Sequence, residues 1–241
     1  MKKLRILSII VLLAGLATFT ISTMARKSKD KQYQPLGFTL IQTESLTLAE
    51  ADPVQVGIWT RIANKRGEWK HTIQRFNEDG TISVQENVGT ERGVYKVFRE
   101  ANGAPAKLEL LSAWAEPDSG WYSSKFYRSS PDFVREEQIL GYTAFVLRSE
   151  THGPGAWTEH YYIPKLGPTW VKMVDYRPDS ETMTVEPVSI ELREPRADFL
   201  KVPAFPVSYD SMREKIDNLQ RSGRKEAAEA FRRQLSSVQN K

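Results

Sequence analysis

The sequence predicts a mainly β fold of the α+β class: a long curved antiparallel meander or open half-barrel, with a helical tail docked on it. Three observations support this prediction. Apolar and polar residues alternate from residue 54 onward, about eleven short runs of this kind follow one another, and turn residues separate most of them. No amphipathic helix interrupts the series before residue 208. Parallel βαβ units would need such helices, so we expect sequential hairpins.

Residues 1–25 are predicted to be a signal peptide or a membrane anchor. A basic start precedes an apolar run at 6–19, and small residues near Ala25 suit signal peptidase. The whole stretch 6–25 is also long enough to cross a bilayer core of about 30 Å as a helix. Either alternative implies export to the periplasm or the cell exterior. The second alternative would tether the domain to the inner membrane.

Residues 26–50 are expected to form a linker, in which 38–50 is a loop or a short helix. The sheet domain is expected at 51–200, and it opens with Val54, Val56 and Ile58 alternating with polar or small residues. The sequence Asn77-Glu78-Asp79-Gly80 predicts a tight hairpin between strands at 69–76 and 81–88. Further strands are expected at 93–99, 107–114, 121–128, 133–140, 142–149, 157–163, 169–177 and 183–193.

Residues 201–241 are predicted to be a helical segment. The proline-rich stretch 202–206 ends the sheet, and Met212, Ile216 and Leu219 then share one helical face. Ser222-Gly223 interrupts the pattern before a second helix at 224–238. We expect these helices to dock on the sheet. Contact with a partner protein or a membrane surface is the alternative.

The charge distribution argues against nucleic-acid binding. The formal net charge is +4, but residues 1–31 contribute +6 and residues 208–241 contribute +3. Residues 32–207 hold 19 basic and 24 acidic residues, a net charge of −5. A domain that grips phosphate backbones should be basic in its folded part. The absence of cysteine excludes disulfides, thiolate metal sites and an acylated lipoprotein N-terminus.

No motif for catalysis, metal binding or cofactor binding stands out. The chain lacks a nucleophile elbow, a phosphate-binding loop and a dinucleotide fingerprint. His71, His152 and His160 lack metal-ligand spacing, and Glu159 and His160 should point to opposite faces of a strand. Glu159 and Asp175 could share one face as an acid pair, the arrangement that a glycosidase needs. We expect a domain without a cofactor or metal, and an enzymatic role is a minor alternative.

Aromatic residues form the candidate ligand site. Tryptophans and tyrosines gather on two of the predicted strands, where they either pack against neighbouring strands or line a concave surface for an acyl chain, a peptide or a sugar. The candidate ligand-binding residues are Trp121, Tyr122, Trp157, Tyr161 and Trp170.

Two segments carry a resemblance to a known family. The strand opening Leu140-Gly141-Tyr142, followed by the aromatic strand 159–163 and the turn Pro164-Lys165-Leu166-Gly167, resembles a pattern in exported bacterial β-sheet proteins of unknown function. More remotely, the meander is similar to the LolA/LolB lipoprotein carriers. That similarity implies a curved sheet covered by helices that holds lipid acyl chains. This sequence shows no clear helix before its first strand.

These observations leave three hypotheses for the function. The leading one is a non-enzymatic β-sheet domain, exported or membrane-anchored, that binds a hydrophobic lipid-like ligand or a peptide on its concave face. The second is an envelope protein-interaction module that acts through its C-terminal helices. The third is a glycan-binding or glycan-cleaving domain that uses exposed tryptophans. A carrier should enclose an apolar cavity, whereas a glycan binder needs Trp157 or Trp170 flat and exposed.

Overall fold

The computed structural model describes residues 32–33, 36–48, 51–99, 105–112, 122–150, 153–178 and 181–239. The predicted signal peptide or anchor at residues 1–25 therefore lies outside the described residues. Within the described part of the chain, no helix is both long and apolar enough to cross a membrane.

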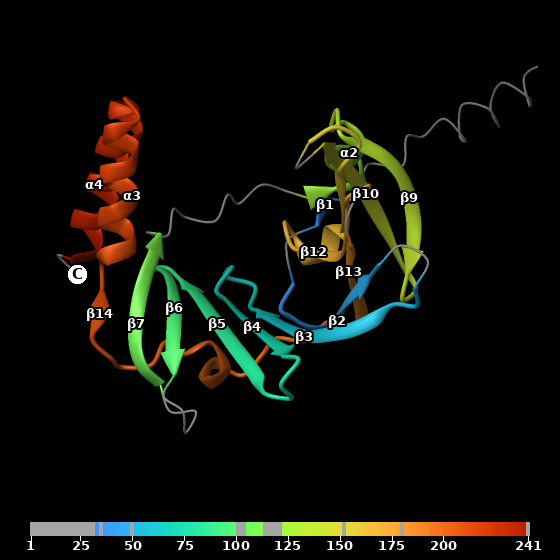
Figure 1. The fold of residues 1–241 in the computed structure, drawn as a ribbon, viewed down its shortest axis with the longest axis horizontal. Coiled ribbons are helices and arrows are strands. Elements are labelled where there is room, and N and C mark those ends of the chain that lie inside the picture. Colours follow the sequence, from blue (N-terminus) through green and yellow to red (C-terminus); the bar gives the residue numbers. More distant parts are fainter. Residues whose placement is uncertain are drawn as a thin grey trace, which may run out of the picture.

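Half of the described residues belong to one sheet of 12 strands, of which eleven form two antiparallel meanders (Figure 1). In each meander every strand pairs with the next one along the chain. The first meander comprises β2 (Phe38–Thr47), β3 (Val54–Ala63), β4 (Trp69–Phe76), β5 (Ile82–Thr90), β6 (Gly93–Arg99) and β7 (Pro105–Ser112). The second comprises β9 (Phe133–Ile139), β10 (Tyr142–Glu150), β11 (Trp157–Tyr162), β12 (Trp170–Tyr176) and β13 (Thr182–Glu191).

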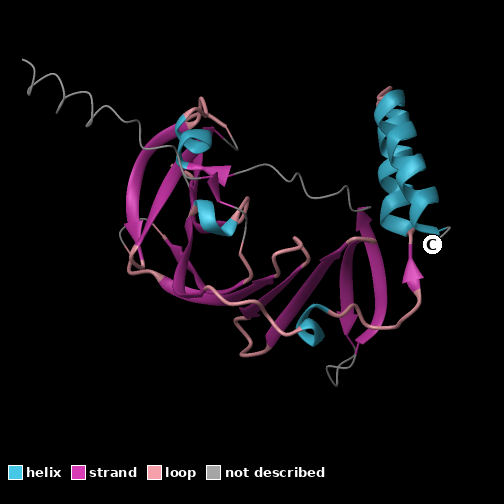
Figure 2. Cartoon of the chain, turned by 180° about the vertical axis from the view of Figure 1, so that it is seen from behind, coloured by secondary structure: helices cyan, strands magenta, loops and turns pink. Residues whose placement is uncertain are grey.

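The two meanders join through β2 and β13, which pair antiparallel in the middle of the sheet from Thr47↔Thr182 to Thr39↔Glu191. The joined sheet curls into an open arc (Figures 1 and 2). The mainly β prediction of a curved antiparallel sheet with C-terminal helices is therefore confirmed. Smaller pieces complete the fold: β1 (Gln32–Tyr33) pairs with β8 (Tyr122–Ser123), and β14 (Val207–Ser208) runs parallel to β7.

The strand β2 corrects the prediction for residues 38–50. The segment Phe38–Thr47 is a strand at the centre of the sheet, not a loop or a short helix within a linker. From Phe38 to Glu44 its even-numbered side chains are buried, and two of these are Gln42 and Glu44. Polar residues at buried positions hide the alternation of period two by which a strand is recognised.

Residues 121–128 differ from prediction in a similar way. Only Tyr122 and Ser123 form a strand, and Ser124–Arg128 is a short helix, α2. The hydroxyl of Ser123 accepts a hydrogen bond from the backbone N–H of Phe126 at 3.0 Å, which caps the helix. The aromatic run was interpreted as strand-forming, but the serine cap decides the local structure.

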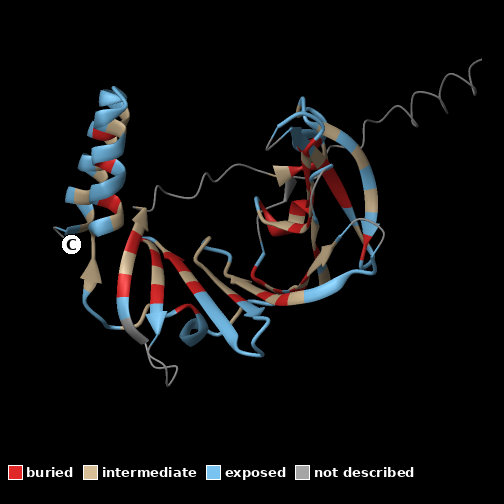
Figure 3. Ribbon diagram, viewed as in Figure 1, coloured by how far each residue is buried: buried red, intermediate tan, exposed pale blue. Residues whose placement is uncertain are grey.

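Strand register assigns side chains to two faces of the sheet. Trp59 is paired with Gln42 and Ile73, and Arg61 is paired with His71, so these residues share one face. On the other half of the sheet that face carries Phe145 and Tyr162, against which α2 packs within the curl. We call it the concave face. Buried residues occur along the strands from the centre of the arc to the strands beside α2 (Figure 3).

The helical tail docks on the sheet, as predicted, and the structure places it on the face opposite the concave one. The helices α3 (Asp210–Arg221) and α4 (Lys225–Gln239) lie side by side at one end of the arc. Met212 is fully buried in a cluster with Val88, Tyr95 and Leu110. Val88 follows Asn87, which pairs with His71, so the cluster lies on the face away from Arg61. The short helices η1 (Pro164–Leu166) and η2 (Ala197–Leu200) occupy connections.

Candidate functional site

A guanidinium surrounded by aromatic rings occupies the middle of the concave face. Trp59 and Arg61 are two residues apart on β3 and therefore point to the same side. His71 on β4 lies opposite Arg61 in the ladder. His160 on β11 and Trp170 on β12 reach the same place from the other half of the sheet, because the arc brings the two meanders toward each other.

Short distances connect these side chains. The guanidinium carbon of Arg61 lies 3.7 Å from the ring centroid of Trp170 and 5.5 Å from that of Trp59. The two tryptophan rings are 5.6 Å apart, the rings of Trp59 and His71 5.1 Å, and the rings of His160 and Trp170 5.6 Å. Such contacts place the cation against ring faces and stabilise it by about 1–2 kcal/mol.

Glu44 and Trp170 fix the geometry of this aromatic cluster. The indole N–H of Trp59 donates to Glu44 Oε2 at 2.8 Å, and Glu44 also binds Arg75 at 3.2 Å. The Nη1 group of Arg61 donates to the backbone oxygen of Trp170 over 3.4 Å, which is a long hydrogen bond. The Nε atom of Arg61 is buried and has no hydrogen-bond partner.

Arg61 differs from the other arginines on the described strands in its lack of an acid. Each of the others forms an ion pair with a glutamate, and no acidic side chain of the described residues pairs with Arg61. A guanidinium offers five N–H donors, so most of its hydrogen-bonding capacity is unused here. The paired arginines are Arg75 with Glu44, Arg99 with Glu86, and Arg135 and Arg148 with Glu159.

Burial sets the charge of the cluster. It lowers the pKa of Arg61 from 12.5 to about 10, so the guanidinium stays charged at neutral pH. Burial, and then the nearby charge of Arg61, lower the pKa of His71 from 6.5 to about 3. The same two causes lower the pKa of His160. Both imidazoles are therefore neutral at pH 7, and the cluster carries a single positive charge.

An aromatic surface continues from this cluster toward α2. Tyr162 lies 6.3 Å from His160 between ring centroids and 5.3 Å from Tyr127, with which it stacks. Tyr127 also stacks on Phe145 at 5.6 Å. Its hydroxyl donates to the backbone oxygen of Gly167 at 2.7 Å, which fixes α2 in the curl. The concave face thus carries a row of rings with one cation among them, in which Tyr127 and Phe145 are buried and Trp170, His160 and Tyr162 are half-buried.

The candidate ligand residues taken from the sequence are distributed over both faces. Trp170 lies in the cluster, and Tyr122 is at the far end of the aromatic row, 6.4 Å from Tyr127. Trp157 and Tyr161 point to the opposite face, because they alternate with His160 and Tyr162 along β11. There Trp157 stacks on Tyr176 at 5.2 Å. Trp121 lies outside the described residues.

Sequence reasoning missed Arg61, Trp59 and His71. The available signal was the spacing Trp59-x-Arg61, with an aromatic and a cation on one side of a strand. A second signal was His71 on the next predicted strand. Neither signal identifies a site alone, because only the curvature of the sheet brings Trp170 and His160 onto the same cation.

The proposed acid pair is wrong. Glu159 lies opposite Val174 in the ladder and Asp175 lies opposite Thr158, so the two carboxylates point to different faces. Each is buried and bound: Glu159 by Arg135 and Arg148, and Asp175 by Thr158 at 2.8 Å and Arg177 at 2.9 Å. Among the described residues, no group of His, Asp and Glu is arranged to hold a metal ion.

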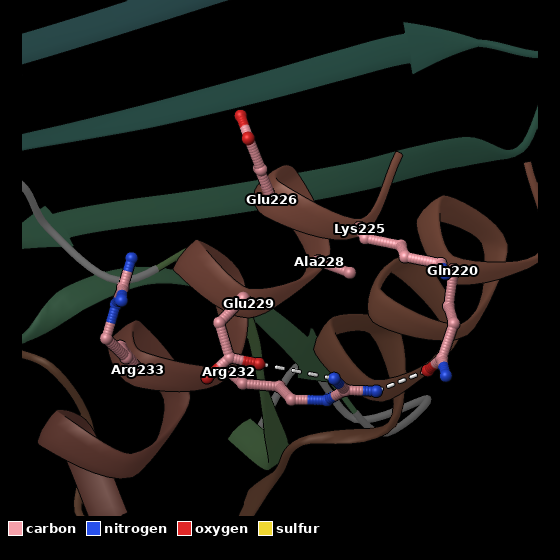
Figure 4. Close-up of a pocket in the computed structure, with 7 residues that line it drawn as sticks. All are labelled: Gln220, Lys225, Glu226, Ala228, Glu229, Arg232 and Arg233. Atoms are coloured by element: carbon pink, nitrogen blue, oxygen red, sulfur yellow. Dashed lines mark hydrogen bonds and ion pairs between the residues drawn. The ribbon is translucent and has the colours of Figure 1, made fainter. Parts of the chain in front are cut away.

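Two hollows formed by described residues lie on the helical hairpin. One of about 620 Å³ is lined by polar side chains of α3 and α4, where Arg232 binds both Glu229 and Gln220 (Figure 4). A second, of about 520 Å³, lies around Ser211, Lys215 and Asn218. Both are open to solvent, unlike the enclosed apolar cavity expected of a carrier. The aromatic concave face is the better candidate for an apolar ligand.

Comparison with known proteins shows a distant likeness of fold. No protein-family model and no curated protein matches the chain. A LolA superfamily protein from Nitrosomonas europaea aligns at a TM-score of 0.33 and 11% identity, over 71% of this chain and 92% of that chain.

Two further solved structures align over a similar part of the chain. An outer membrane lipoprotein-sorting protein domain from Vibrio parahaemolyticus has a TM-score of 0.30 and 9% identity, over 74% of this chain and 94% of that chain. PNGF-II has a TM-score of 0.36 and 12% identity, over 72% of this chain but 31% of that chain. Likenesses at this distance transfer no function, so the function is argued from the side chains of the chain itself.

Proposed function

We propose that this is a non-enzymatic binding domain that holds a hydrophobic, lipid-like ligand along its concave face. The observation that carries the proposal is the row of aromatic rings from Trp59 and Trp170 through Tyr162 to Tyr127, on the inside of a curled sheet. Burying an apolar chain against such rings is favourable by roughly 25 cal/mol per Å² of apolar surface removed from water.

The same residues disfavour the other hypotheses. The apolar side chains of α3 and α4 are used against the sheet, with Met212 and Ile216 both buried, so the hairpin presents a mainly polar surface to any partner. The ring of Trp157 is engaged by Tyr176 and by Arg148, whose guanidinium lies 4.6 Å from its centroid. The ring of Trp170 is engaged by Arg61. Neither Trp157 nor Trp170 therefore presents the flat, exposed ring that stacks on a sugar.

We propose further that residues 6–25 direct the domain to or through a membrane, so that the ligand is met in the periplasm or outside the cell. N-terminal sequencing of the protein recovered from cells tests this point. A mature chain that starts at Arg26 supports cleavage. An intact N-terminus in the membrane fraction supports the anchor, and an intact N-terminus in the cytosolic fraction contradicts export.

Analysis of co-purified material tests the ligand class. The full chain is purified without denaturant and extracted with organic solvent, and the extract is examined by mass spectrometry. We expect acyl-chain compounds in near-stoichiometric amount with the wild type. The variant Trp170→Ala should lose them, and the matched variant Trp157→Ala, on the opposite face, should retain them. Equal recovery from both variants would contradict binding on the concave face.

A further inference from the structure

Unused hydrogen-bonding groups gather around Arg61. Within the described residues, four buried side-chain polar atoms lack a partner: Gln42 Oε1, Arg61 Nε, His71 Nε2 and Asn87 Oδ1. They belong to the adjacent strands β2, β3, β4 and β5. Buried polar atoms in folded proteins are nearly always hydrogen-bonded, so each exception needs a cause.

All four atoms lie on the concave face. Arg61 pairs with His71 across the ladder, and His71 pairs with Asn87, so these three side chains form a row. Gln42 pairs with Trp59 and so belongs to the same face. Directly paired side chains on one face have Cβ atoms about 5 Å apart. One bound group could therefore reach several of these residues, whereas unrelated defects would be scattered over the sheet.

The charges next to Arg61 are already compensated, and Lys96 lies beyond Asn87 at the far end of the row. On the concave face Glu44 is paired with Arg75, and Asp175 is paired with Arg177. His71 and His160 are neutral at pH 7 because their pKa values are lowered. The charge left without an acid among the aromatic rings is that of Arg61, and in such a setting the attraction of a negative charge is stronger than in water.

We propose that Arg61 binds the headgroup of the ligand, and that the ligand is an amphiphile with one negative charge, such as a carboxylate or a phosphodiester. The inference rests on the proposed function, because it assigns a headgroup to the apolar chain held on the same face. Every other arginine on the described strands forms an ion pair with a glutamate. For Arg61, the negative headgroup of the bound ligand would take the place of that glutamate. A group with two negative charges would leave one uncompensated and is disfavoured.

The test compares amphiphiles that share one chain and differ in the headgroup. Dodecanoic acid, dodecanol, and a lysophosphatidylglycerol with a dodecanoyl chain are titrated into the full-length protein by calorimetry. We expect the two anions to bind at least about tenfold more tightly than the alcohol, since a hydrogen-bonded ion pair contributes about 1.5–3 kcal/mol. Tighter binding of either anion supports the inference and identifies the headgroup class.

Three variants locate the charge. Arg61→Gln should abolish the preference for anions while retaining affinity for dodecanol, and Arg61→Lys should retain part of the preference. Arg193→Gln removes the same charge from a side chain that is 81% exposed and should change nothing. Circular dichroism confirms that each variant is folded.

The two proposals fail in different ways. Equal affinity of wild type for acid and alcohol, or an anion preference that survives in Arg61→Gln, would overturn the headgroup inference and leave the proposed function standing. Absence of binding by all three amphiphiles would overturn the proposed function itself.

Discussion

The guanidinium of Arg61 lies 3.7 Å from the ring of Trp170, although 109 residues separate them in the chain. Their strands are not neighbours: β2 and β13 lie between β3 and β12 in the sheet. A flat sheet would hold the two side chains about 14 Å apart, since strands are spaced by about 4.8 Å. The contact between Arg61 and Trp170 is therefore possible only because the sheet is curved. It also shows why the cluster exists only in the folded domain.

Replacing Arg61 with methionine should stabilise the protein. Burial lowers the pKa of Arg61 from 12.5 to about 10, which corresponds to about 3 kcal/mol of unfavourable desolvation. The contact with Trp170 offsets about 1–2 kcal/mol of it. We expect Arg61→Met to raise the free energy of unfolding by about 1 kcal/mol in urea titrations, as is common where a binding site is maintained at a cost in stability.

The matched control for that variant is Arg135→Met. Arg135 binds Glu159 through Nη1 at 2.8 Å and Nη2 at 2.9 Å, so its loss should lower the free energy of unfolding by about 3 kcal/mol. If Arg61→Met lowered the free energy of unfolding by a similar amount, Arg61 would have a stabilising role in the fold, which contradicts the proposal that its charge is available for a ligand.

The buried carboxylate of Glu159 should be a main contributor to stability. Burial alone would raise the pKa of Glu159, but hydrogen bonds from Arg135, Arg148 and Tyr161 outweigh it and hold the pKa at about 2. Glu159→Gln should lower the free energy of unfolding by about 3 kcal/mol at pH 7. Glu137→Gln removes a carboxylate that is 35% exposed and should cost less than about 1 kcal/mol.

The same shift gives the pH dependence for Glu159. Because the folded-state pKa lies below the ordinary glutamate pKa of 4.5, the contribution is complete above about pH 4.5 and is lost as the pH falls toward 2. The difference in stability between wild type and Glu159→Gln should therefore shrink across that window. A difference that stays constant from pH 5 to about pH 3 would contradict the ion-pair account.

Neutral His71 should make the protein less stable in mild acid. The pKa of His71 is about 3 in the folded state and 6.5 in the unfolded chain. Between these two pH values the unfolded state therefore binds a proton on His71 and the folded state does not. Stability is thus lost as the pH falls from 6.5 toward 3. Between pH 8 and pH 5, His71 should account for a loss of about 2 kcal/mol.

Denaturant unfolding of wild type and His71→Gln at the two pH values measures this loss. The variant lacks the titrating imidazole, so its stability should decline by about 2 kcal/mol less than that of the wild type. An equal decline in both proteins would mean that His71 accepts a proton in the folded state.

The helical hairpin should stabilise the sheet without contributing to the ligand site. Met212 is fully buried against Val88, Tyr95 and Leu110, so Met212→Ala should lower the free energy of unfolding by about 3 kcal/mol. Affinity for dodecanoic acid should not change, because this cluster lies on the face away from Arg61. Glu214→Ala, on the exposed side of α3, should alter stability by less than about 0.5 kcal/mol. A loss of affinity for dodecanoic acid in the folded Met212→Ala protein would show that the helical hairpin contributes to ligand binding, which contradicts this prediction.

Alternation and turn residues were sufficient to predict most strands and the curved antiparallel sheet. They failed for β2, where Gln42 and Glu44 occupy buried positions, because the pattern of period two assumes that buried residues are apolar. They also failed for α2, where one serine cap outweighs an aromatic run. In both segments a specific polar contact decided the structure, and composition alone does not reveal such contacts.

The site was only partly predictable for a related reason. Trp170 and Tyr122 were chosen as aromatic residues on predicted strands; Trp170 lies on the concave face, and Tyr122 lies beside Tyr127 at the end of the aromatic row. Trp157 and Tyr161 were chosen on the same ground, but their position in the alternation of β11 turns them to the other face. Arg61 could not be chosen, because its significance lies in the absence of an acid partner among the described residues, which is a property of the fold.

Fluorescence quenching by a brominated acyl chain tests ligand binding on the concave face most directly. Bromine quenches an indole only on contact, so dodecanoic acid with bromine at the chain end reports which tryptophans the chain touches. We predict saturable quenching of the wild type and of Trp157→Phe, and a large loss of quenching in Trp59→Phe/Trp170→Phe. Quenching of the double variant that equals that of the wild type would contradict the account, because the chain would then lie away from the Arg61 cluster.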